Sequence, residues 1–161
     1  MSRPRSSELE YIEQFGRFWE ASGSRTTGRI VGWLMICEPR HQSAAELVEA
    51  LGVSTGSVST LIRGLIDLEF VERVTFPGDR ASYYQMRDHA WTRVVDNQVN
   101  AFRHLADLAA QGQAMLPPER TDRVDDLADM TAFFLAEWPA LLERLHAQVD
   151  PSARGVEPAA T

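Results

Sequence analysis

The sequence predicts a mainly α-helical fold with one small β-hairpin near its middle. Apolar residues recur every three or four positions over most of the 161 residues, which indicates amphipathic helices. From Phe70 the residue types become β-branched and aromatic, and turn-forming residues divide this stretch into two strands. A turn at Gly52 separates two short helical segments just before the hairpin.

Composition narrows the class of protein. With 44% hydrophobic and 24% charged residues, the chain has the composition of a globular domain. No secretory segment is visible, and the longest apolar stretch, residues 30–37, is far too short to cross a bilayer. The single cysteine, Cys37, excludes an internal disulfide framework and favours a reducing cytoplasm. We therefore expect a cytoplasmic protein with a single domain over residues 1–150 and a disordered tail at 151–161.

The N-terminal region predicts two helices. Ser7 and Glu10 form a capping-box pattern, which predicts a first helix over about 8–21. A second helix over about 27–37 must end before Pro39, because proline disfavours the helical conformation in the residue before it.

A second capping box, Ser43 with Glu46, predicts a short third helix over residues 44–51. Gly52 suits the left-handed residue that ends this helix, and Ser54 suits the N-cap of a fourth. The fourth helix has an apolar face and a small, polar one. The apolar face comprises Val58, Leu61, Ile62, Leu65 and Leu68, and the polar face Ser57, Thr60, Arg63, Gly64 and Asp67.

The C-terminal half predicts the hairpin and two long helices. Strands flank the turn sequence "PGDRA", and a long helix follows over about 89–115. Pro118 suits the first turn of a last helix, in which Pro139 predicts a kink. The helices over 7–22 and 89–149 carry more apolar surface than so small a core can cover, so we expect them to dimerise with a second copy.

A tight helix pair followed by a two-stranded wing is the pattern of a winged helix-turn-helix, here over about 27–88. The net charge is −7, and all 16 basic side chains are arginines. Residues 52–87 carry 4 arginines against 4 acids, whereas residues 88–161 carry 6 against 12. The middle of the chain is therefore neutral enough to approach a phosphate backbone.

The stretch "LGVSTGSVSTLIRGL" also contains G-x-S-x-G, the pattern of a nucleophile elbow. An elbow needs a buried strand before the serine, but a capped helix is predicted before Ser54. The four histidines (His41, His89, His104 and His146) lack the close spacing of a metal site. Because no convergent catalytic set can be assembled, we predict that the protein is not an enzyme and needs neither metal nor cofactor.

Cys37 and the tryptophans are interpreted as packing residues. Cys37 follows an apolar helix and suits a small core position. The four tryptophans fall on apolar helix faces, where they pack in a core or a dimer, or else line a ligand cavity. They are Trp19, Trp33, Trp91 and Trp138.

Residues 28–86 resemble the winged helix-turn-helix of the MarR family of bacterial regulators. The resemblance lies in "SAAELVEALGVSTGSVSTLIRGLIDLEFVERVTFPGDRASYY", and the segment "GRIVGWLMICEPRHQSAAEL" is most similar to the GbsR-like branch. It implies a homodimeric transcriptional regulator of palindromic double-stranded DNA operators. It also implies a repressor released when a small-molecule ligand enters a cavity between the dimerisation helices and the DNA-binding lobe.

The chain departs from the family pattern at several positions. Val48 stands where alanine is common, and Thr55 where a basic residue is frequent. The wing tip has a single arginine, Arg80, where two adjacent basic residues are common. Glu69 stands where a glycine usually ends the recognition helix, and a left-handed conformation there costs about 1–2 kcal/mol.

The predicted DNA-binding residues lie on the fourth helix and the hairpin. The helix N-terminus offers unpaired N–H groups and a partial positive charge, and small hydroxyls permit close contact with the major groove. We expect Arg63 to read guanine or hold a phosphate, and Arg80 to enter the minor groove. The full set is Thr55, Ser57, Ser59, Thr60, Arg63, Arg73, Arg80 and Arg87. The alternative is a winged-helix module that binds proteins and not DNA, which the acidic C-terminal half favours.

Overall fold

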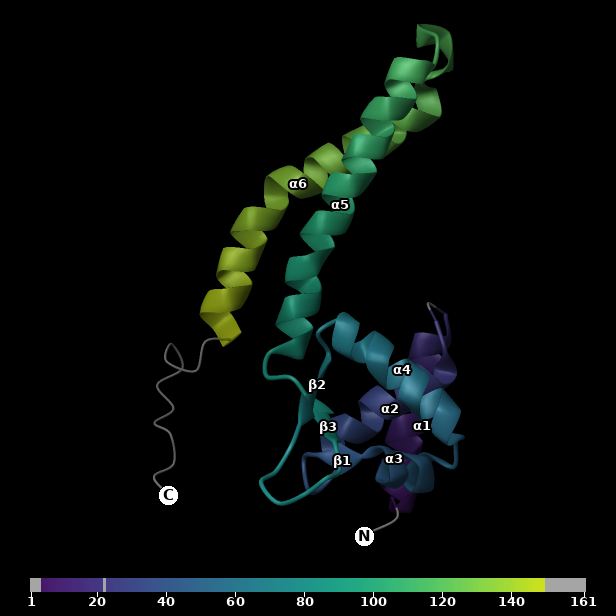
Figure 1. Cartoon of the computed structure of the whole chain (residues 1–161). Coiled ribbons are helices and arrows are strands. Elements are labelled where there is room, and N and C mark those ends of the chain that lie inside the picture. The colour runs from purple at the N-terminus through teal and green to yellow at the C-terminus, as the bar shows by residue number, and fades with distance from the viewer. Residues whose placement is uncertain (1–3, 22, 150–161) are drawn as a thin grey trace. The chain divides into compact units, whose positions relative to one another are not determined.

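The computed structural model describes residues 4–21 and 23–149, so the predicted tail at 151–161 lies outside the described residues. The chain divides into two compact units, Met1–Ala90 and Trp91–Thr161 (Figure 1). The first unit contains α1 (Ser6–Glu20), α2 (Arg25–Ile36), β1 (Gln42–Ser43), α3 (Ala44–Leu51), α4 (Thr55–Asp67), β2 (Val71–Val74) and β3 (Tyr83–Met86). The second contains α5 (Ala90–Met115), the 3-10 turn η1 (Pro118–Arg120) and α6 (Asp122–Val149). Only the first residue of α5, Ala90, belongs to the first unit.

Helix α1 begins earlier than the capping pattern predicted, so the Ser7–Glu10 capping box is wrong. The N-cap is Arg5, whose backbone N–H donates to the Glu8 carboxylate at 2.7 Å. Glu8 therefore caps the helix in place of Glu10, which lies two residues later, and the ion pair of Glu8 with the Arg5 side chain adds to the same contact.

Helices α1 and α2 pack closely because glycine lies between them. A Cβ atom on Gly28 would lie 2.3 Å from the Phe15 carbonyl oxygen, so no other residue fits there without a shift. Ile12, Ile30 and Val31 are fully buried in the same unit. Helix α2 starts two residues before the predicted start and ends at Ile36, and Cys37 after it has extended backbone.

The predicted turn between α3 and α4 is confirmed in detail. The Ser43 hydroxyl accepts from the Glu46 N–H at 3.2 Å, and the Glu46 carboxylate accepts from the Ser43 N–H at 2.6 Å. Gly52 ends α3 with a φ of 64°. The Ser54 hydroxyl then caps α4 by accepting from the Ser57 N–H at 3.2 Å. A helix precedes Ser54, so the serine does not lie on a nucleophile elbow.

On the apolar face of α4 three residues are buried, Leu61 is half-buried and the last residue is exposed. Val58, Ile62 and Leu65 are at most 2% exposed, but Leu68 is 57% exposed, so its predicted burial is wrong. Leu68 is the C-cap of α4, and the chain turns away at Glu69, whose φ is 59°. The left-handed conformation predicted for Glu69 is thereby confirmed.

The wing contains one strand more than the predicted hairpin. The sheet has the order β1-β3-β2 and is antiparallel, with Gln42 opposite Tyr84 and Val71 opposite Met86. Strand β1 has two residues, too few to show an alternating pattern. It ties the segment before α3 to the wing, so the wing is part of the same unit as α4.

Helices α5 and α6 lie side by side as a hairpin (Figure 1). Phe102 stacks on Phe134 with ring centroids 4.8 Å apart, and Gln113 donates to Asp125 at 2.6 Å. Pro118 begins η1 and not α6, so its predicted place in the last helix is wrong: a separate 3-10 turn intervenes before Asp122. Within the described ranges, no helix combines the length and the apolar character that crossing a membrane requires.

Candidate nucleic-acid interface

The outward face of α4 carries five of the predicted DNA-binding residues. All of them are exposed: Thr55, Ser57, Ser59, Thr60 and Arg63. The first turn of α4 contains no acidic residue, so the positive end of the helix dipole is not neutralised within that turn. The face can therefore approach an anionic surface although Arg63 is its only cation.

Two glycines make this face unusually flat. Gly56, Thr60 and Gly64 follow one another at intervals of four residues, so they line one side of the helix. A Cβ atom on either glycine would have no atom of the described residues within 4 Å. A glycine in a helix interior costs about 0.5–1 kcal/mol relative to alanine. No neighbour within the described chain requires Gly64, which leaves close approach of another molecule as a reason for it.

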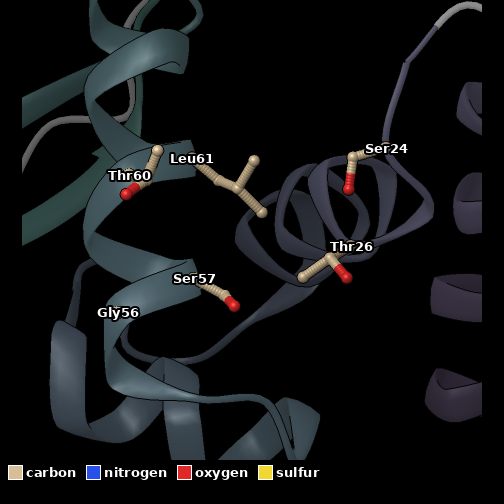
Figure 2. A pocket seen from close by; sticks show the side chains of 6 residues that line it. All are labelled: Ser24, Thr26, Gly56, Ser57, Thr60 and Leu61. Carbon is tan, nitrogen blue, oxygen red and sulfur yellow. The ribbon is translucent and has the colours of Figure 1, made fainter.

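A shallow hollow of about 430 Å³ lies between α4 and the first turn of α2. Figure 2 shows Ser57 and Leu61 of α4 pointing toward Ser24 and Thr26. The Ser57 hydroxyl lies 2.8 Å from the Ser54 hydroxyl, so it is already engaged in the N-cap. The lining contains no charged residue: it consists of Ser24, Thr26, Gly56, Ser57, Thr60 and Leu61.

Arg63 lies along α4. Its Nε donates to the Ser59 carbonyl, one turn earlier, at 3.2 Å. This bond draws the guanidinium toward the N-terminal half of the helix, where Ser59 and Thr60 are exposed. Arg63 can thus present its terminal nitrogens beside the small residues of the same face.

The wing tip is ordered by a turn and by one carboxylate. The Asp79 N–H donates to the Phe76 carbonyl at 3.1 Å, and Gly78 has a φ of 83°, as a type II turn with Pro77 at its second position requires. The Asp79 carboxylate then accepts from the Ala81 N–H at 2.8 Å. Arg80 lies between these two residues and is exposed.

The Asp79 carboxylate also accepts from the Tyr83 hydroxyl at 2.7 Å. The hydrogen bonds from the Ala81 N–H and from Tyr83 hold the pKa of Asp79 below its usual range. The hydrogen bond to Asp79 also raises the pKa of Tyr83, because an ionised Tyr83 would have no proton left to donate to the carboxylate. At neutral pH the pair is thus a neutral hydroxyl bonded to a charged carboxylate.

The other two wing arginines differ from each other. Arg73 is exposed on β2, opposite Tyr84. Arg87 is half-buried: its backbone N–H donates to the Phe70 carbonyl at 2.9 Å. Its Nε is buried and has no hydrogen-bond partner within the described chain. Contact with a phosphate is therefore open to its terminal nitrogens and not to Nε.

Of the residues predicted to pack, some are buried as expected and one is exposed. Cys37 is buried, as predicted, and burial raises the pKa of its thiol to about 11. Trp33 is also buried and donates to Gln42 at 3.4 Å, and Trp19 packs edge-on against Phe70. Trp91 is 42% exposed.

In the described part of the chain, no group of three or more His, Cys, Asp or Glu side chains could hold a metal ion.

The sequence did not predict the contact between Asp79 and Tyr83, nor the position of Ser24 and Thr26 in the hollow beside α4. The "PGD" sequence signals a turn and a carboxylate that can cap it. The partner on β3 depends on the register of the strands, and the hollow depends on how α2 packs against α4. Neither is visible in a local pattern.

Together these elements define a winged helix-turn-helix protein with a separate two-helix hairpin. A profile for the MarR family matches residues 24–82, and a profile for MmpR5-like MarR family transcriptional regulators matches residues 89–148. The chain is 38% identical over 129 residues to the HTH-type transcriptional regulator MmpR5 of Mycobacterium tuberculosis, a match that covers 78% of each protein. A crystal structure of a transcriptional regulator also matches, with a TM-score of 0.78 and 36% identity over 86% of this chain and 97% of the other. The protein belongs to the MarR family and is a DNA-binding transcriptional regulator.

Proposed function

We propose that the protein is a homodimeric repressor that binds a palindromic operator through α4 and the wing of each protomer. The observation that carries this proposal is that Gly56, Thr60 and Gly64 lie exposed along one side of α4. The two glycines carry no side chain that would hold α4 away from the bases. A helix this slender can lie deep in a major groove, where its backbone and short hydroxyls come close to the base edges.

Few charged residues contribute to this interface, and all of the proposed ones are arginines. Arg63 contacts a guanine or a phosphate beside the hydroxyls of Thr55, Ser59 and Thr60. Arg80 enters the adjacent minor groove, and Arg73 and Arg87 hold phosphates from the hairpin. Because phosphate contacts position a protein and base contacts specify its site, the arginines set the affinity while α4 sets the sequence preference. The list of proposed contacts is Thr55, Ser57, Ser59, Thr60, Arg63, Arg73, Arg80 and Arg87.

The second unit supports dimerisation. Among its described residues only Ala109 and Thr131 are buried. Large apolar side chains remain exposed on both of its helices: Trp91, Leu108 and Met115 on α5, and Met130, Phe133 and Leu141 on α6. Exposed apolar surface of this extent indicates a protein interface, and a second copy of the same chain covers it in a two-fold dimer.

Regulation by a small-molecule ligand completes the proposal. We place the protein in the cytoplasm, where its operator lies.

The GbsR-like branch stays a prediction based on residues 28–47, and the neighbouring genes would test it. Genes for osmolyte uptake beside this gene would support that branch, whereas genes for an efflux pump would point to aromatic or drug-like ligands.

The test is binding to the DNA upstream of the protein's own gene, measured by fluorescence anisotropy against a scrambled duplex of the same length and composition. We expect a preference of at least about 1000-fold for the upstream duplex, with two protomers bound per site. Equal, weak binding to both duplexes would contradict operator recognition and favour the protein-binding alternative.

A further inference from the structure

We propose that Tyr83 is a positioning residue for DNA binding, because its hydroxyl fixes Asp79 and thereby orients Arg80 at the wing tip. The inference rests on the proposed function, in which Arg80 enters the minor groove. It assigns a role in recognition to a residue that need not touch DNA.

The backbone around Arg80 is held by hydrogen bonds of the two residues beside it. Asp79 precedes it and bonds to the N–H of Ala81, which follows it, at 2.8 Å. This contact closes a small ring of chain around Arg80, so the carboxylate restricts the backbone at the position that carries the arginine. The N–H of Asp79 is also held, at 3.1 Å from the Phe76 carbonyl.

The Asp79 carboxylate is itself held by Tyr83. Tyr83 is the first residue of β3, opposite Val74 on β2 and Ser43 on β1. Its hydroxyl donates to the second oxygen of Asp79 at 2.7 Å. The bond therefore joins the tip of the hairpin to a residue that is paired on both sides in the sheet.

The Tyr83 ring is held in turn by two other aromatic rings. Its ring meets His41 edge-on with centroids 5.2 Å apart, and it meets Phe76 at 5.3 Å. His41 and Phe76 also contact each other at 4.6 Å. His41 precedes β1, in the segment that leads into α3, so the three rings connect the wing to the helix-turn-helix and fix the direction of the Tyr83 hydroxyl.

The consequence concerns the entropy of binding. Without the hydroxyl, the residues between β2 and β3 sample more conformations, and ordering them on DNA lowers the affinity. Loss of one such hydrogen bond corresponds to a decrease in affinity of about threefold. The loss should appear only where Arg80 is present to benefit from it.

The experiment is a double-mutant cycle on affinity for the upstream duplex. Tyr83→Phe keeps the ring contacts and removes the hydroxyl, and we expect about threefold weaker binding. Arg80→Ala should weaken binding about tenfold. The double variant should bind as weakly as Arg80→Ala alone, whereas independent effects would multiply to about thirtyfold. Asp79→Ala removes the carboxylate and should also give no further loss in the Arg80→Ala background.

Tyr84→Phe is the matched control, since Tyr84 is the next residue of β3 and its side chain points to the opposite face of the sheet. It should bind as tightly as the unaltered protein. Unchanged affinity of Tyr83→Phe, or an equal loss with and without Arg80, would overturn the positioning role. Failure of the unaltered protein to prefer the upstream duplex would instead overturn the proposed function, so the two failures are distinguishable.

Discussion

The two compact units of the protein differ in how completely they bury their apolar residues. In the first unit, Ile12, Leu47, Val58 and Val71 are fully buried. In the second, Phe133 is 61% exposed and Met115 78% exposed. The first unit therefore has a core of its own, whereas the second has a surface suited to a second copy of the chain. The difference predicts that changes on the exposed apolar faces of α5 and α6 act on assembly, whereas changes on α4 and the wing act on DNA contact.

The largest effect is expected for Phe133→Asp in the second unit. A charge at this exposed apolar position should dissociate the dimer, because it cannot be buried in an apolar interface without a partner. Operator affinity should then fall by about 100-fold, since two half-sites are no longer bound together. Size-exclusion chromatography with light scattering measures the assembly, and Phe133→Leu is the control that should remain dimeric. A Phe133→Asp dimer with normal affinity would contradict this role of the second unit.

Arg80→Ala tests the first unit. We expect operator affinity to fall about tenfold while the dimer and the melting temperature are unchanged, because the side chain is exposed at the wing tip. Arg123→Ala, at an exposed position of α6, is the control and should have no effect. Unchanged DNA binding in a mobility-shift assay would remove Arg80 from the interface.

Gly64→Ala separates stability from recognition within the first unit. Alanine should stabilise the fold by about 0.5–1 kcal/mol, since its Cβ would meet no atom of the described part of the chain within 4 Å. The same methyl group should weaken operator binding by about threefold to tenfold, because it holds α4 away from the groove. Chemical denaturation and anisotropy measure the two quantities. Tighter or equal DNA binding by this variant would show that the open face of α4 does not approach DNA closely.

Glu69→Gly should have the smallest effect, because it should change the stability of the fold and leave DNA binding unchanged. Glu69 has a φ of 59°, a conformation that costs about 1–2 kcal/mol for residues with a Cβ atom. Glycine relieves this cost but has more freedom in the unfolded chain, so we expect a net gain of about 0.5–1 kcal/mol. The melting temperature should rise by a few degrees, and a fall would show that the Glu69 side chain stabilises the turn by more than its backbone conformation costs.

The parts of the fold that the sequence predicted correctly are those with local causes. Ser43, Glu46, Gly52 and Ser54 each act on a backbone group within three or four residues, and all four behave as predicted. The left-handed Glu69 was also predicted correctly, though from a family resemblance and not from its own chemistry.

The parts that were missed depend on contacts between distant residues. Strand β1 exists because Gln42 and Ser43 pair with β3, about forty residues later in the chain. The bond from Tyr83 to Asp79 depends on strand register, and the hollow beside α4 depends on the packing of α2. At the site, the exposure of the predicted helix residues followed from helical periodicity. That the Nε of Arg87 has no hydrogen-bond partner among the described residues could only be seen in three dimensions.

The most direct test of the central claim, that a nearly uncharged helix and a few arginines recognise the operator, is the salt dependence of binding. Each phosphate neutralised contributes roughly 0.9 to the slope of log affinity against log salt concentration. Residues 52–87 contain 4 arginines per protomer, so a dimer should give a slope of about −7, and no steeper than about −10 when helix ends contribute. A slope steeper than about −10 would contradict the account, because cations outside α4 and the wing would then dominate the contact.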